Sequence, residues 1–99
     1  MIGNAAAPEQ LEMTELTAPE RAVLRSQLEA RCLAVIEEYA ADPKWGGATS
    51  DEVAIKLDLE ISCVAPRITA LLHEHDRIIA SGFRRMTRRG SSASVWIPR

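Results

Sequence analysis

Aromatic residues are scarce in this chain of 99 residues, which has two Trp, one Tyr and one Phe. Cysteine is equally rare, since Cys32 and Cys63 are the only two. They are too few for a disulfide scaffold and too far apart for a CxxC motif, so we expect a reducing, cytoplasmic setting. Five Gly and five Pro exclude collagen-like and low-complexity chains.

Long apolar runs are also missing. No stretch approaches the roughly 20 residues that a membrane-spanning helix needs, so we expect no membrane association. The first residues lack a basic segment followed by a long apolar one, which argues against a secretory signal. The length fits one small domain. We expect this domain at residues 17–99, preceded by an N-terminal arm at residues 1–16.

The net charge of −2 hides a strong asymmetry. Residues 1–60 carry 12 acidic and 5 basic side chains, whereas residues 61–99 carry 2 acidic and 7 basic ones. Such a polarised chain presents one positive end, which predicts an anionic partner.

Two capping boxes mark helix starts. Thr17 with Glu20 predicts a helix over residues 18–41, which Asp42 and Pro43 end. Its buried stripe is expected to contain Leu24, Leu28, Cys32, Val35, Ile36 and Tyr39.

The second capping box, Thr49 with Glu52, predicts a short helix that stops by Asp58. After a tight turn, a third helix is expected to start near Ser62, which would be its N-cap and would leave Pro66 close enough to the start to be tolerated. The buried face of this third helix is predicted to hold Val64, Ile68, Leu71 and Leu72.

The residue pattern then changes to that of strands. Residues 77–81 and 94–97 are predicted to form two strands joined by a polar segment. This segment has four arginines and no acidic residue: Arg84, Arg85, Arg88 and Arg89. The expected fold class is therefore α+β.

Residues 49–59 and 64–71 resemble the winged helix-turn-helix domains of small prokaryotic and bacteriophage proteins, and residues 87–96 are similar to the wing of that family. The resemblance implies a recognition helix at 62–74, a wing at 82–93, and a close helix crossing at Ala54. It further implies binding to double-stranded DNA, with the recognition helix in a major groove and the wing on the sugar-phosphate backbone.

The chain departs from the family at three points. Asp58 stands in the turn where the family usually has Gly, and Asp tolerates the left-handed conformation better than most residues. Glu60 stands where Ser or Thr often caps the recognition helix, and its carboxylate would face phosphates badly. No Gly closes the helix near His75 and Asp76.

The side of the third helix opposite the core supplies the candidate DNA contacts. Ser62, Pro66, Thr69 and His73 lie on this side at helical spacing, with Cys63, Ala65, Arg67 and Ala70 on its flanks. Of these, Arg67 alone has the fork that suits guanine, so base readout is expected to be modest. Arg67 could instead pair with Glu60 or Asp51. With the four arginines of the wing, the predicted contact set is Ser62, Cys63, Ala65, Pro66, Arg67, Thr69, Arg84, Arg85, Arg88 and Arg89.

Nothing in the sequence predicts an enzyme, a metal site or a cofactor. His73 and His75 are two residues apart and point in nearly opposite directions on a helix. Cys63 and His73 are too distant on one helix to form a catalytic pair. Cys32 and Trp96 are expected in the core, while Trp45 could either anchor a partner or pack on the sheet.

The leading interpretation is a phage or prokaryotic transcriptional regulator, with the arm and the first helix as a candidate homodimer interface. The alternative is a protein-interaction module, such as a phage inhibitor of a host CRISPR or polymerase complex. A third interpretation is a structural subunit of a larger assembly.

Overall fold

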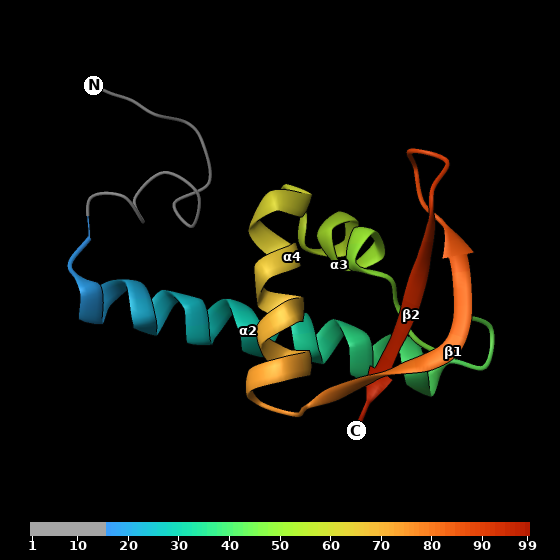
Figure 1. Cartoon of the computed structure of the whole chain (residues 1–99), viewed down its shortest axis with the longest axis horizontal. Coiled ribbons are helices and arrows are strands. Elements are labelled where there is room, and N and C mark those ends of the chain that lie inside the picture. The colour runs from blue at the N-terminus through green and yellow to red at the C-terminus, as the bar shows by residue number, and fades with distance from the viewer. Residues whose placement is uncertain (1–15) are drawn as a thin grey trace.

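The structure is a computed structural model and describes residues 16–99. Its longest helix, α2 (Ala18–Ala41), begins at the predicted capping box, in which Thr17 and Glu20 bond each other's backbone N–H. The buried side chains of α2 all lie from Leu28 onward, so its first ten residues contribute none. The first half therefore projects beyond the rest of the molecule (Figure 1).

The second and third helices pack on the second half of α2. Helix α3 (Ser50–Leu57) starts at the predicted capping box of Thr49 and Glu52. It ends at Asp58, whose φ of 57° and ψ of 46° confirm the expected left-handed turn. Ala54 is fully buried, so α3 approaches its neighbours closely.

Helix α4 (Ile61–Thr69) starts earlier than predicted. Its N-cap is Glu60 rather than Ser62, and the Glu60 side chain makes no capping hydrogen bond. Pro66 therefore lies inside the helix, as its sixth residue. The prediction of Ser62 as the N-cap was wrong, because Glu60 in extended conformation begins the helix without a side-chain hydrogen bond.

The predicted single helix at 62–74 is also divided. After Thr69 the chain widens into one turn of π-helix, η2 (Ala70–Glu74), where the His75 N–H donates to the Ala70 carbonyl over 3.0 Å. Ala70 was expected on the outward flank, but only 4% of it is exposed, because it belongs to the buried side of this wider turn. The missing Gly is replaced by Asp76, which adopts a φ of 55°.

The two strands are longer than predicted and form one antiparallel hairpin. Strand β1 (Ile78–Met86) pairs with β2 (Ser92–Pro98), and the register shifts between Ala80 and Arg84. Most of the predicted polar loop at 82–93 is therefore strand, and the turn itself is short. Because the upper hairpin is exposed on both faces, it lacks the alternation of apolar and polar residues that marks a half-buried strand.

The core lies between the second half of α2, the helices α3 and α4, and the base of the hairpin (Figure 1). Trp96 packs on it as predicted, and Ala48 pairs with Trp96 through two backbone hydrogen bonds. Next to this pair, Gly47 has a φ of 132°, and a Cβ there would lie 2.5 Å from the Trp96 carbonyl oxygen. The connector before α3 thus requires Gly at this position. The central residues of the core are Leu28, Cys32, Ile36, Val53, Ala54, Val64, Ile68, Leu71 and Ile78.

The described chain is thus a mixed α+β structure with three α-helices and a two-stranded antiparallel hairpin. Of the expected N-terminal arm at residues 1–16, residues 1–15 lie outside the described part of the chain. Within residues 16–99, no helix has the length and apolar character needed to cross a membrane.

Candidate functional site

The first turn of α4 and the hairpin turn lie on the same side of the molecule, with α3 between them (Figure 1). This side brings together most of the residues that the sequence singled out. They come from two segments, 62–69 and 84–89, which are separated in sequence by η2 and the base of the hairpin.

The outward face of α4 carries small, uncharged side chains. Ser62, Ala65, Pro66 and Thr69 are exposed, as predicted from helical spacing, and Cys63 is half-buried. The Thr69 hydroxyl donates to the Ala65 carbonyl over 3.1 Å, so it is partly satisfied within the helix. This face can approach another surface closely but offers few groups that distinguish one ligand from another.

Arg67 does not extend from that face. Its Nη1 lies 2.5 Å from Oε2 of Glu29 on α2, and the two side chains are only 17% and 13% exposed. Glu60 and Asp51, the partners considered from the sequence, were wrong, because Arg67 lies on the flank of α4 that turns toward α2. The one guanidinium on α4 is thus held between two helices.

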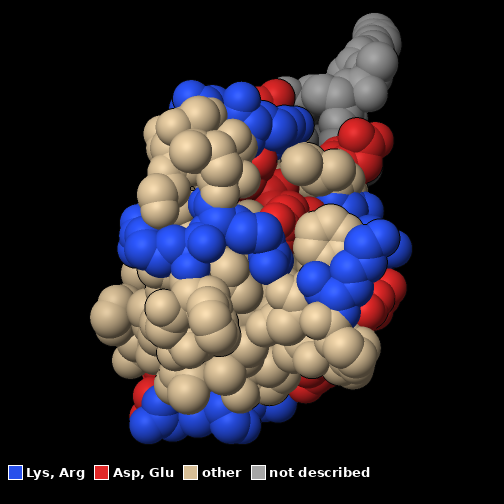
Figure 2. Space-filling model, turned by 90° about the vertical axis from the view of Figure 1, so that its right-hand side faces the viewer, with Lys and Arg blue, Asp and Glu red and all other residues tan. Residues whose placement is uncertain are grey.

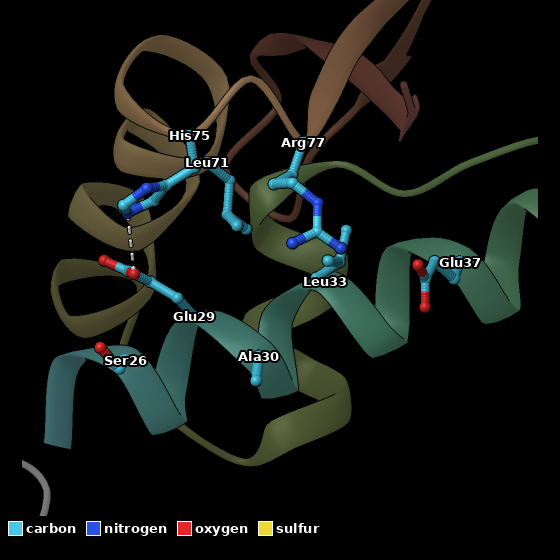
Figure 3. Close-up of a pocket in the computed structure, with 8 residues that line it drawn as sticks. All are labelled: Ser26, Glu29, Ala30, Leu33, Glu37, Leu71, His75 and Arg77. Atoms are coloured by element: carbon cyan, nitrogen blue, oxygen red, sulfur yellow. Dashed lines mark ion pairs between the residues drawn. The ribbon is translucent and has the colours of Figure 1, made fainter. Parts of the chain in front are cut away.

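Glu29 also receives a second partner. Its Oε1 lies 3.2 Å from Nε2 of His75, which follows the π-helical turn (Figure 3). The same carboxylate therefore joins α2 to both ends of the segment 67–75. Beside it, an open groove of about 520 Å³ runs between α2 and the end of η2, with Leu33, Leu71 and Arg77 among its lining residues.

Arg85, near the turn end of β1, links the hairpin to the connector and to α3. Its guanidinium donates to both carboxylate oxygens of Glu52, at 2.8 and 2.6 Å, and to the carbonyls of Trp45 and Gly47. It also lies over the Trp45 ring, 5.4 Å from the centroid. Trp45 in turn contacts Tyr39, with ring centroids 5.0 Å apart. These contacts hold the hairpin, the connector and α3 in one arrangement.

The pKa of the Glu52 carboxylate is lowered in this environment. Its burial alone would raise the pKa, but the hydrogen bonds from Arg85 and from the Thr49 backbone outweigh that effect and hold the pKa below its usual value. Glu52 thus belongs to the capping box, as the sequence predicted, and also fixes Arg85.

Arg88 at the hairpin turn pairs with a second acid of α3. Its Nη2 lies 2.7 Å from Oδ1 of Asp51, and its Nε and backbone N–H also donate to that carboxylate. The hydrogen bond from Arg88 lowers the pKa of Asp51. The wing segment has no acid of its own, but two acids of α3 compensate two of its four arginines.

The other two arginines form no ion pair with a carboxylate among residues 16–99. Arg84 donates to the hydroxyls of Ser92 and Ser94 and to the Ser92 carbonyl. Arg89 is exposed; its backbone N–H donates to the Thr87 hydroxyl, and its charge contributes to the lowered pKa of Asp51 without forming an ion pair. Figure 2 shows that basic side chains gather at the upper edge and across the middle of the hairpin side, with acidic side chains between them.

The structure adds two exposed apolar residues that the sequence analysis missed. Phe83 is 74% exposed and Met86 is 69% exposed, both on β1 beside Arg84. Their sequence positions give a signal, because a Phe and a Met interrupt an otherwise polar segment. The segment was expected to be a loop, however, and a loop does not predict which side chains are exposed. Trp45, 38% exposed, is packed between Tyr39 and Arg85.

Among residues 16–99, the cysteines and histidines form no metal-binding cluster. In the described part of the chain, no three His, Cys, Asp or Glu residues are placed to hold a metal ion. Cys32 is fully buried, as predicted, and its burial raises the pKa of the thiol to about 11. His73 is exposed and lies on η2, beyond the end of α4.

Comparison of the chain with protein-family models, with curated proteins and with solved structures gives no match. Any assignment of function therefore rests on the geometry and charges described above.

Proposed function

We propose that this chain is a winged helix-turn-helix protein that binds double-stranded DNA, as expected of a phage or prokaryotic transcriptional regulator. The observation that carries the proposal is the common orientation of the first turn of α4 and the arginine-bearing hairpin turn (Figure 1). Between α3 and α4, the left-handed Asp58 provides the short connection that a helix-turn-helix requires.

In this proposal α4 enters the major groove and the hairpin follows the backbone. The exposed Ser62, Ala65, Pro66 and Thr69 are small enough to let the helix sit deep in the groove. Arg84, Arg88 and Arg89 supply phosphate contacts, which give affinity without sequence information. For Arg88, a phosphate has to compete with Asp51.

The position of Arg67 limits the selectivity of such a protein. Because Glu29 holds its guanidinium between α2 and α4, Arg67 is not presented to a guanine edge. Ser62 and Thr69 alone discriminate weakly between base pairs. We therefore propose sequence-tolerant binding, in which the backbone and the shape of the duplex dominate.

A direct test is a fluorescence-anisotropy titration of the full chain with a mixed-sequence duplex and with single-stranded DNA of equal length. The proposal predicts salt-sensitive binding that favours the duplex. Absence of binding to either DNA at low salt would overturn it.

A second candidate function, docking onto another protein, is favoured by one observation. Phe83 and Met86 are exposed next to arginine, and Phe, Met and Arg are all enriched in protein interfaces. A protein of a host complex, as considered from the sequence, is the partner class for this candidate. Capture of such a protein from nuclease-treated lysate, with loss of capture in Phe83→Ser, would support it over DNA binding.

A further inference from the structure

The outer part of the hairpin combines exposed apolar side chains with two arginines that form no ion pair among residues 16–99. We call it the wing surface and define it by Phe83, Arg84, Met86 and Arg89. The β-bulge between Ala80 and Arg84 accompanies the outward placement of Phe83, whose N–H donates to the Ser81 hydroxyl over 3.1 Å. Bulges commonly re-aim a side chain in this way. Among the described residues, the outer edge of β1 pairs with no strand.

The chain itself contains a segment of complementary composition. Residues 1–15 hold three acidic side chains, Glu9, Glu12 and Glu15, and no Lys or Arg. Leu11 and Met13 alternate with these acids. Acidic and apolar residues in this segment thus match the basic and apolar residues of the wing surface.

The length of the chain decides which copy can supply this segment. Residues 1–15 join the described structure at Leu16, beside the start of α2. The hairpin lies at the other end of α2, where Arg85 contacts Trp45 and Gly47 just beyond the last residue of the helix. The 24 residues of α2 separate these points by about 36 Å.

Within one chain the segment is too short for this contact. Glu12 lies four residues before Leu16, which corresponds to at most about 14 Å of extended backbone. Glu15 is closer still to Leu16. Neither carboxylate can reach the wing surface of its own chain.

We propose that residues 1–15 of one copy bind the wing surface of a second copy. Glu12 and Glu15 pair with Arg84 and Arg89, while Leu11 and Met13 cover Phe83 and Met86. This contact does not depend on DNA binding, but it occupies arginines that the proposed function assigns to phosphates. It therefore competes with DNA wherever both occur.

Charge reversal in two separate chains tests the proposal. One variant carries Glu9→Lys, Glu12→Lys and Glu15→Lys, and the other carries Arg84→Glu and Arg89→Glu. Each should self-associate at least about tenfold more weakly than the full-length wild-type chain in sedimentation equilibrium at low salt, because like charges then face each other. An equimolar mixture should regain association, because the Lys segment fits the Glu wing.

Matched controls carry the same kinds of charge change elsewhere. Glu74→Lys and Arg99→Glu alter exposed residues outside the wing surface and should leave self-association unchanged. A monomeric wild-type chain under all conditions would overturn the proposal. Association that survives both reversals would also overturn it and would place the interface elsewhere, for example on α2. The self-association of the variants and of the controls is measured without DNA. The result therefore tests this proposal independently of the DNA titration.

Discussion

Glu29 and Arg67 form a mostly buried ion pair between α2 and α4, with Oε2 and Nη1 2.5 Å apart. The pair connects positions 38 residues apart and removes the one arginine of α4 from the outward face. Because Nε2 of His75 lies 3.2 Å from the other carboxylate oxygen, Glu29 contacts both the helix and the residue that follows the π-helical turn. The orientation of α4, and with it the proposed DNA contact, depends on one carboxylate of another helix.

Glu29→Ala should therefore destabilise the fold. Removing one partner leaves the Arg67 charge largely buried without compensation, which we expect to cost about 2–3 kcal/mol in the free energy of unfolding. The double variant Glu29→Leu with Arg67→Met should recover most of that loss, since no unpaired charge remains. Urea denaturation monitored by tryptophan fluorescence measures both.

The exposed pair Lys56–Glu38, at 3.6 Å, is the matched control. Its side chains are about half exposed, so Glu38→Ala should change the unfolding free energy by less than about 0.5 kcal/mol. Equal effects of Glu29→Ala and Glu38→Ala would show that the α2–α4 pair is not structural.

Asp58 provides a test of the helix-turn-helix connection. At a φ of 57°, Asp58→Gly should be neutral or slightly stabilising, whereas Asp58→Val should destabilise by about 1–2 kcal/mol. Glu60→Val is the control, because Glu60 has a φ of −70° that β-branched residues accept. A melting temperature of Asp58→Val equal to that of wild type would contradict the turn described here.

The hydrogen bonds of Arg85 with Glu52 predict a specific acid sensitivity. The pKa of Glu52 is lowered in the folded state, so its contribution to stability is present above the ordinary value of 4.5 and is lost as the pH falls through the folded value. Glu52→Gln should show a shallower loss of stability than wild type between about pH 5 and pH 3.

Arg85→Met should show the same shallower pH dependence, because the guanidinium provides the main hydrogen bond that lowers the pKa. Unfolding free energies from urea titrations at several pH values give the comparison. Parallel curves for wild type and both variants would be incompatible with this role of Arg85.

The two cysteines should differ in reactivity. Cys32 is fully buried with a pKa of about 11, so its thiolate is scarce and inaccessible at neutral pH. In Cys63→Ser, a thiol reagent should modify Cys32 only after denaturant is added, which mass spectrometry of the modified peptide detects. Rapid labelling of native Cys63→Ser would refute the buried position of Cys32.

Local signals in the sequence predicted much of the fold. Both capping boxes, the bounds of α2 and the left-handed Asp58 are confirmed, because each depends on residues within one or two turns of each other. The start of α4 at Ile61 was not predicted, since Glu60 caps through its backbone alone. The π-helical turn likewise has no sequence signature of its own.

The sequence predicted which residues belong to the candidate site, but not which side chains pair with one another. Helical spacing correctly placed Ser62, Pro66 and Thr69 on the exposed side of α4. The carboxylate partners of Arg67, Arg85 and Arg88 lie 33 to 38 residues away along the chain, so only the folded structure identifies them. Whether the contact set binds DNA stays a prediction.

The proposed DNA contact depends most directly on Arg84 and Arg89, the two wing arginines that form no ion pair among residues 16–99. The decisive measurement is the slope of log affinity against log salt on duplex DNA for wild type and for Arg84→Ala with Arg89→Ala. Each lost phosphate contact should flatten the slope by roughly 0.9, so the account predicts a reduction approaching about 1.8, similar on all sequences. The control, Arg77→Ala with Arg99→Ala, removes equal charge outside the wing surface and should keep the wild-type slope. Equal slopes for wild type and the wing variant would contradict the account.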